Sequence, residues 1–150
     1  LKNTIEYLTE CGQEIDERTV ETYKYYRDKR RIKMDQSLNM VKIAYDALDD
    51  KLAEDIKIID IRSISVLADY FIIADGNNKN QVQAMVDNVQ EELFKAGYEM
   101  KQMEGYREGN WILLDFGDII IHIFDKENRL FYDLERIWKD GKEVSIEELN

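Results

Sequence analysis

The stretch GNWILLDFGDIIIHIF, residues 109–124, decides the fold class of this chain. It contains two apolar runs, WILLDF at 111–116 and DIIIHIF at 118–124, which are separated by the single residue Gly117. Short runs of this kind are typical of β-strands, and apolar residues at nearly every position are typical of strands that are covered on both faces. The stretch therefore predicts two central strands of a layered sheet.

The segments around this stretch predict a mixed α/β fold. Short β-branched or aromatic runs indicate further strands at 56–61, 69–75 and 98–104. Apolar residues at helical spacing indicate helices at 37–48, 78–96 and 127–140, the last with Leu130, Leu134, Ile137 and Trp138 on one face. This order favours a mixed β-sheet of about five strands with helices packed on its faces. The strand–helix–strand passage through 70–103 favours at least one parallel or crossover connection.

The chain divides into a helical extension, residues 1–35, and a main domain, residues 36–150. The extension begins with a predicted helix, NTIEYLTEC at 3–11, which Gly12 would end. A second helix follows, with Asp16 as its N-cap.

A basic cluster, KRRIK at 29–33, is predicted to end this second helix. Its four positive charges suit the partial negative charge of a helix C-terminus. A solvated helix end is the simpler interpretation, and contact with nucleic acid is the alternative. The next helix is then predicted to start with Ser37 as its N-cap.

The net charge of −11 is unevenly distributed. Residues 1–35 hold eight basic and eight acidic side chains, whereas residues 36–150 hold 13 basic and 24 acidic ones, so the whole excess lies in the main domain. Phosphate attraction needs clustered Lys and Arg, which makes bare nucleic acid a poor partner for that domain. A basic protein suits it better, although the acidity could also serve solubility alone.

The composition favours a cytoplasmic protein. No apolar run approaches the ~20 residues that a membrane helix needs, and no basic segment followed by an apolar one indicates a secretory leader. The single cysteine, Cys11, cannot form an internal disulfide, which fits a reducing compartment.

Few residues could carry metal chemistry. The chain has one histidine and one cysteine, far apart, which cannot supply the usual zinc ligands. A magnesium site built from Asp69, Asp115 and Asp118 is conceivable, and a magnesium-dependent nucleotidyl- or phosphoryl-transferring enzyme is the alternative function. However, Asp115 and Asp118 flank a glycine, where Asp is a common turn residue. No metal and no cofactor are therefore predicted.

The lone histidine, His122, has no evident catalytic partner. Period-two alternation places it on the same strand face as Ile120 and Phe124, and no serine lies near it in sequence. The segment DGNNKNQV, residues 75–82, matches neither the P-loop nor the dinucleotide-binding pattern. A partly buried strand histidine is the simplest interpretation.

Aromatic residues near a glycine-flanked loop indicate a contact surface instead. Tyr106 lies in the loop GYREGN, 105–110, and Trp111 follows it. Trp, Tyr and Arg dominate the residues that contribute most to protein interfaces, so this region could bind a basic partner. The alternative is that Trp111 belongs to the core.

Residues 37–140 closely resemble the ribosomal silencing factor family, also called RsfS or Iojap-like proteins. The resemblance rests on three motifs in their order and spacing, ADYFIIADG (68–76), EGYREGNWILLDFGDIIIHIF (104–124) and RLFYDLERIW (129–138). The turn after the first motif, Asp75-Gly76-Asn77-Asn78, departs from the small hydroxyl residues usual in the family.

The resemblance implies a fold related to nucleotidyltransferases without their catalytic signature, and therefore no enzyme activity. It also implies binding to the large ribosomal subunit through large-subunit ribosomal protein fourteen, which blocks joining of the small subunit and lowers translation when nutrients fail. Members tend to form homodimers when free. The candidate partner-binding residues carried over from the family are Tyr106, Trp111, Asp115, Asp118, His122, Arg129, Tyr132 and Glu135.

The first 33 residues do not resemble that family. They are weakly similar to the C-terminal end of YqeK-type HD-domain phosphohydrolases, which predicts that the extension is the end of a fused upstream domain. The extension contains no histidine, so it lacks the metal ligands of that enzyme class and is not expected to be a hydrolase.

Overall fold

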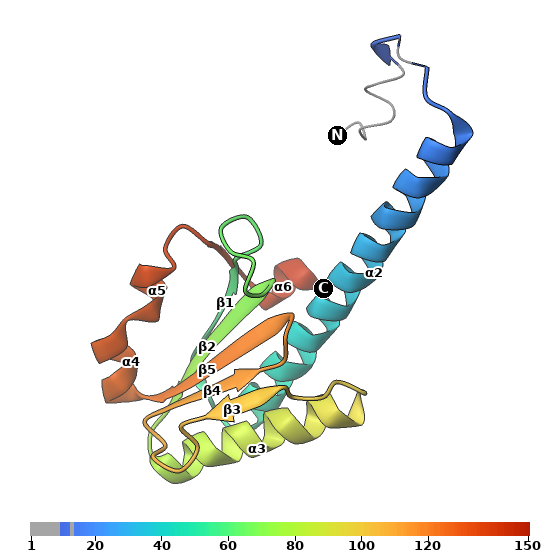
Figure 1. The fold of residues 1–150 in the computed structure, drawn as a ribbon. Coiled ribbons are helices and arrows are strands. Elements are labelled where there is room, and N and C mark those ends of the chain that lie inside the picture. The colour runs from blue at the N-terminus through green and yellow to red at the C-terminus, as the bar shows by residue number, and fades with distance from the viewer. Residues whose placement is uncertain (1–9, 13) are drawn as a thin grey trace. The chain divides into compact units, whose positions relative to one another are not determined.

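The computed structural model describes residues 10–12 and 14–150 and contains one six-stranded mixed β-sheet (Figure 1). The strands are β1 (Glu54–Asp60), β2 (Tyr70–Gly76), β3 (Gln102–Glu104), β4 (Trp111–Asp115), β5 (Ile119–Asp125) and β6 (Lys142–Val144). Their order across the sheet is β3-β4-β5-β2-β1-β6. The predicted α/β class is confirmed, with one strand more than expected.

The sheet combines one parallel pair with antiparallel neighbours. β2 runs parallel to β5, and the other four neighbouring pairs are antiparallel. Helix α3 (Lys79–Lys95) connects β2 to β3, which is the crossover predicted for 70–103, although β3 and β2 are separated in the sheet by β4 and β5. The parallel partner of β2 is therefore β5.

The opening stretch forms two strands, as predicted, and these are neighbours in the sheet. Gly117, with φ of +84°, joins β4 to β5 in a tight turn, and its N–H donates to Asp115 Oδ1 at 2.7 Å. Both β2 and β5 lie inside the sheet and are buried on both faces at most positions. β4 instead alternates, because Ile112 and Leu114 are buried whereas Trp111 is only partly so.

Helix α2 (Glu17–Asp50) corrects two predictions. Asp16 does cap its start by accepting from the Thr19 N–H at 2.7 Å. The predicted end at 29–33 and restart at Ser37 are wrong, because no glycine or proline interrupts residues 17–50 and the helix continues through them. Ser37 is no N-cap, since its Oγ donates to Asp69 Oδ2 at 2.6 Å.

The C-terminal helical segment is also shorter than predicted. Helix 127–140 was expected, but α4 (Lys126–Tyr132) and α5 (Leu134–Ile137) are separated by Asp133, whose φ of +48° is left-handed. Asp tolerates that conformation better than most residues. Of the four residues predicted to form one apolar face, Leu134 is buried, Trp138 is partly buried, and Leu130 and Ile137 are exposed.

The helix predicted at 3–11 lies almost wholly outside the described residues. At the other end, Ser145 caps the short helix α6 (Ile146–Leu149) by accepting from the Glu148 N–H. No helix among the described residues is long and apolar enough to cross a membrane. The contacts divide the chain into two compact units, Leu1–Asp35 and Gln36–Asn150.

The second unit has two differently covered sheet faces. The face under α3 and residues 37–48 of α2 forms the larger core, and we call it the closed face. The opposite face lies under α4 and α5, and we call it the open face (Figure 1). Its smaller core contains Phe71, Phe124 and Leu134, with Trp111 and Trp138 packed against it.

Candidate functional site: an aromatic surface on the open face

Ring-bearing side chains gather on the open face because strand alternation directs them there. β2 contributes Phe71, β4 contributes Trp111, and β5 contributes His122 and Phe124. The register pairs Trp111 with Phe124, and their rings stack at 5.2 Å between centroids. Tyr132 of α4 closes over Trp111 at 4.6 Å. These side chains, together with Trp138, form what we call the aromatic cluster.

The only histidine holds Trp111 in place. Trp111 Nε1 donates to His122 Nδ1 at 3.1 Å. Because Nδ1 accepts, the neutral imidazole carries its proton on Nε2. His122 is buried, and this burial lowers its pKa from 6.5 to about 4. At neutral pH the ring is therefore an uncharged acceptor for the indole.

His122 Nε2 is an unusual feature of this arrangement. It is buried, and it has no hydrogen-bond partner among the described residues. Its ring meets Phe71 edge to face, with centroids 5.1 Å apart. A buried donor without an acceptor costs free energy, so the ring's position is set mainly by packing and by the bond from Trp111.

From the aromatic cluster, a continuous series of rings extends to the surface and ends at Phe131. His122 is 5% exposed, Trp111 is partly buried, Tyr132 is 40% exposed, and Phe131 is 78% exposed. The Phe131 ring meets Tyr132 edge to face at 5.1 Å. Leu130 beside it is 82% exposed. Such a contiguous apolar surface on a charged domain is typical of an interaction site.

A glycine sets the backbone before Trp111. Gly105 has φ of +80°, and a Cβ at this position would collide with the Trp111 carbonyl oxygen. Only glycine fits this approach, so the loop 105–110 is tied to the strand that carries the indole.

Arg129 organises the carboxylates beside the aromatic cluster. It is buried, and its Nη1 donates to Asp75 Oδ2 at 2.8 Å. Its Nε donates to Glu135 Oε1 at 2.9 Å, and Nη2 lies 2.8 Å from the same oxygen and 3.2 Å from Asp55 Oδ2. Arg129 thus links α4 and α5 to the start of β1 and the end of β2. The orientation of α4 depends on this link.

This ion network borders a hollow of about 530 Å³. Its walls carry more negative than positive groups, with five carboxylates and three basic side chains among the lining residues Glu54, Asp55, Lys57, Asp75, Lys126, Arg129, Leu130, Asp133 and Glu135. The exposed apolar surface therefore has an acidic margin, which favours a basic partner.

The structure separates the remaining candidate residues from this surface. Asp115 and Asp118 flank the turn at the far end of β4, and Asp115 lies four residues, or roughly 13 Å, from Trp111. Asp115 accepts from the Gly117 N–H, and Asp69 accepts from Ser37. Within the described ranges, no group of three or more His, Cys, Asp or Glu side chains could hold a metal ion. The magnesium-dependent alternative gains no support from this geometry.

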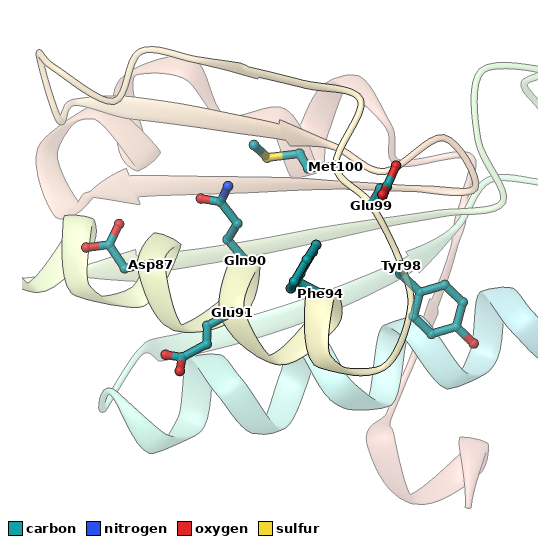
Figure 2. A pocket seen from close by; sticks show the side chains of 7 residues that line it. All are labelled: Asp87, Gln90, Glu91, Phe94, Tyr98, Glu99 and Met100. Carbon is teal, nitrogen blue, oxygen red and sulfur yellow. The ribbon is translucent and has the colours of Figure 1, made fainter.

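Tyr106 lies on the other side of the sheet. It packs against the core of the closed face, and its hydroxyl donates to Asp87 of α3 at 2.9 Å. Asp87 also lines a second hollow, of about 480 Å³, between α3 and the segment 98–100. Figure 2 shows Phe94, Tyr98 and Met100 around this hollow, with Asp87, Glu91 and Glu99 also lining it.

Sequence reasoning missed the exposed pair Leu130 and Phe131. The helical spacing placed Leu130 on a buried face, because a continuous helix over 127–140 was assumed. The left-handed Asp133 breaks that register, so Leu134 is buried as predicted whereas Leu130 is exposed. The aspartate itself was the only available signal, since it can adopt the left-handed region.

The fold and the site together define a class of protein, namely a mixed α/β protein that presents an aromatic surface with an acidic margin. A family model described as "Ribosomal silencing factor during starvation" matches residues 34–150. The chain belongs to this family, and the resemblance drawn from its motifs is confirmed.

Individual relatives agree with this assignment. The ribosomal silencing factor RsfS of Bacillus subtilis (strain 168) is 44% identical over 103 residues, which cover 69% of this chain and 87% of the relative. The chloroplastic protein Iojap of Arabidopsis thaliana is 30% identical over 106 residues, which cover 71% of this chain and 44% of that protein.

Solved structures support the fold. A crystal structure from Chromobacterium violaceum has a TM-score of 0.66 at 34% identity and covers 71% of this chain and 88% of its own. One from Bacillus halodurans has a TM-score of 0.65 at 36% identity and covers 71% of this chain and 97% of its own.

Proposed function

We propose that this chain binds the large ribosomal subunit through large-subunit ribosomal protein fourteen and blocks joining of the small subunit. Membership of the ribosomal silencing factor family supports the ribosome as the target. The observation that carries the proposal is the series from His122 through Trp111 and Tyr132 to exposed Phe131. It presents apolar rings on a domain that holds the whole net charge of −11.

The contact residues are Trp111, Leu130, Phe131 and Tyr132. His122 and Arg129 act as positioning residues, because the first holds the indole and the second, with Glu135, holds α4. The acidic turn at Asp115 and Asp118 would contribute long-range attraction to a basic ribosomal protein. Tyr106 lies on the closed face and is not part of this contact surface.

The mechanism is steric. Binding occupies a surface of the large subunit that the small subunit must reach, and no covalent bond is made or broken. The acidic margin would steer the domain away from rRNA phosphates and towards protein, because like charges repel. In the absence of ribosomes, we expect the exposed apolar surface to support a homodimer.

The test is co-sedimentation of purified variants with large ribosomal subunits at moderate salt. Loss of a central aromatic residue at an interface typically costs ~2 kcal/mol, or about 30-fold in affinity. We expect Trp111→Ala to reach this loss and Phe131→Ala to lose about tenfold. Phe94→Ala is the matched control, because Phe94 is 68% exposed but lies on α3, the helix that covers the closed face.

Two further measurements complete the test. One shows whether a variant that loses binding is still folded, and the other shows whether binding blocks subunit joining. Circular dichroism establishes that each variant is folded, and Trp111→Phe retains an aromatic ring if Trp111→Ala does not fold. Light scattering on mixing the two subunits follows their joining, which the parent chain should inhibit and the Trp111 variant should not. Folded Trp111→Ala and Phe131→Ala proteins that bind like the parent would refute the proposed surface.

A further inference from the structure

The segment KYYRDKRRIK, residues 24–33, is not part of the surface described above, and we call it the basic segment. It contains six Lys or Arg residues and one Asp. All of its side chains are exposed. It belongs to the first compact unit, and the family model begins at residue 34, immediately after it. Whatever this segment binds is therefore additional to the activity of the family domain.

The simpler interpretation of these charges, a solvated helix end, does not agree with the structure. A basic cluster stabilises the last turn of a helix, but α2 continues from Lys33 to Asp50. The charges lie in mid-helix, where the dipole gives them no benefit. Arg27 is placed three and four positions from Arg30 and Arg31, and like charges at these spacings destabilise a helix.

Few carboxylates offset this repulsion. Arg27 pairs with the adjacent Asp28 at 3.2 Å. Lys24, Arg30 and Arg31 have no carboxylate at ion-pair distance in the part of the chain that the structure describes. The concentration of positive charge is therefore available to an external anion.

Two tyrosines accompany the arginines. Tyr25 and Tyr26 are 54% and 65% exposed, and their rings meet edge to face at 5.4 Å. Lys29 Nζ lies 4.7 Å from the centre of the Tyr25 ring. Exposed aromatic rings beside cationic side chains are the combination that stacks on nucleic-acid bases while binding phosphates.

We propose that the basic segment is an RNA-binding site that contacts the phosphate backbone through Lys24, Arg27, Arg30 and Arg31. Tyr25 and Tyr26 stack on unpaired bases. The charges of the basic segment alone predict affinity for a polyanion. The identification of that polyanion as RNA rests on the proposed function at the ribosome.

Other anionic partners fit less well. A helix that lies on a membrane surface needs an apolar face, and Ile32 is the only aliphatic residue between 24 and 33. The acidic domain of a second copy would satisfy the charge but gives the paired tyrosines no bases to stack on. RNA uses both features of the segment.

The experiment measures binding of the full chain to a fluorescently labelled RNA hairpin by anisotropy, at KCl concentrations from about 50 to 200 mM. The test variant is Arg27→Gln, Arg30→Gln, Arg31→Gln. The matched control, Lys101→Gln, Lys139→Gln, Lys142→Gln, removes the same charge from exposed positions of the main domain. Glutamine is a good helix former, so helicity should be retained, and circular dichroism would check it.

We expect the parent and the control to bind alike, and the arginine variant to bind at least tenfold more weakly. Its plot of log affinity against log salt should be shallower by roughly two to three, since each lost phosphate contact removes about 0.7 to 0.9. Tyr25→Ala, Tyr26→Ala should weaken binding to the unpaired loop more than to a blunt duplex.

The outcomes separate this inference from the proposed function. Trp111→Ala should bind the hairpin as the parent does while losing large-subunit binding, and the arginine variant should keep the Trp111-dependent contact. Absence of hairpin binding at low salt, or equal binding by the arginine variant and the control, overturns the inference. So does binding of anionic vesicles or self-association that requires the arginines without any affinity for the hairpin.

Discussion

The two faces of the sheet are built by different means. On the closed face, α3 buries five apolar side chains completely, namely Val82, Met85, Val86, Val89 and Leu93. On the open face, α4 and α5 together bury Leu134 and the charged Arg129, and they leave Leu130, Phe131 and Ile137 in solvent. One face thus provides packing, and the other combines aromatic rings with buried polar groups. The difference indicates that the closed face supplies most of the stability and the open face supplies the contact surface.

The open face also contains most of the buried polar groups. Asp75, His122 and Arg129 are all at least nine-tenths buried and lie on this face or at its end. Buried polar groups are costly unless they are paired, and Asp75 Oδ1 and His122 Nε2 have no hydrogen-bond partner within the described residues. This face therefore depends on a few specific interactions, and three of its properties can be tested.

The largest effect should come from Arg129. Arg129→Met leaves Asp75 and Glu135 without their buried cation, and breaking a buried ion pair typically costs 3–5 kcal/mol of unfolding free energy, so we expect about that loss. Urea denaturation measures it.

Arg136→Met is the matched control for this prediction. Arg136 pairs with Asp133 at 3.2 Å, but its side chain is 78% exposed. Exposed pairs contribute roughly 0–1 kcal/mol, so this variant should unfold almost as the parent does. Equal losses from the two substitutions would show that burial of Arg129 contributes nothing.

The second prediction compares neighbouring residues of β5 that point to opposite faces. Ile121 is fully buried on the closed face, whereas Ile120 is partly buried on the open face. Ile121→Ala should cost about 3 kcal/mol, because it leaves a cavity in a tightly packed core. Ile120→Ala should cost about 1 kcal/mol, because solvent already reaches this position.

The unfolding free energies of these two variants, measured under the same conditions, decide whether the faces differ. If Ile120→Ala is as costly as Ile121→Ala, the open face contributes equally to stability, and the proposed division between the faces is wrong.

The sheet and most caps were predictable because their determinants are local. Alternation placed His122 and Phe124 on one face, and Asn78 caps α3 by accepting from the Gln81 N–H, as a helix start at this residue predicted. Gly97, with φ of +89°, follows the last turn of the same helix. Each of these features depends on residues only a few positions apart.

Two of the errors occurred where a distant partner decides the structure. Ser37 has the chemistry of an N-cap, but Asp69, 32 residues away in sequence, accepts its hydroxyl. Strand β6 is three residues long and exists because it pairs with β1, Val144 opposite Ile58. Neither contact has a signature in the local sequence.

The same distinction applies to the candidate site. Trp111 and His122 were both identified from their residue type, but whether Trp111 belonged to the core or the surface stayed open. Trp111 belongs to both. Its indole N–H donates to the buried ring of His122, and the aromatic side chains around it extend to the exposed Phe131. Asp75, the buried partner of Arg129, was not identified, because the two residues are 54 positions apart.

The third and smallest effect is a pH dependence that originates at His122. In the folded chain its pKa is about 4, below the ordinary value of 6.5, because burial disfavours the imidazolium. Above pH 6.5 the ring is neutral in both states, and stability is intact. As the pH falls below 6.5, the unfolded chain takes up the proton and the folded chain does not, so stability is lost until the pH reaches about 4.

These two pKa values correspond to a loss of about 2 kcal/mol between pH 7 and pH 5. His122→Gln retains a group that can accept from Trp111 Nε1 but cannot titrate. Its unfolding free energy should therefore fall by about 2 kcal/mol less than that of the parent over the same interval. Other groups titrate equally in both proteins, so the difference between the two pH profiles isolates this ring. Identical profiles would mean that the imidazole is accessible to protons in the folded chain, and the open face would then be less closely packed around Trp111 than the structure indicates.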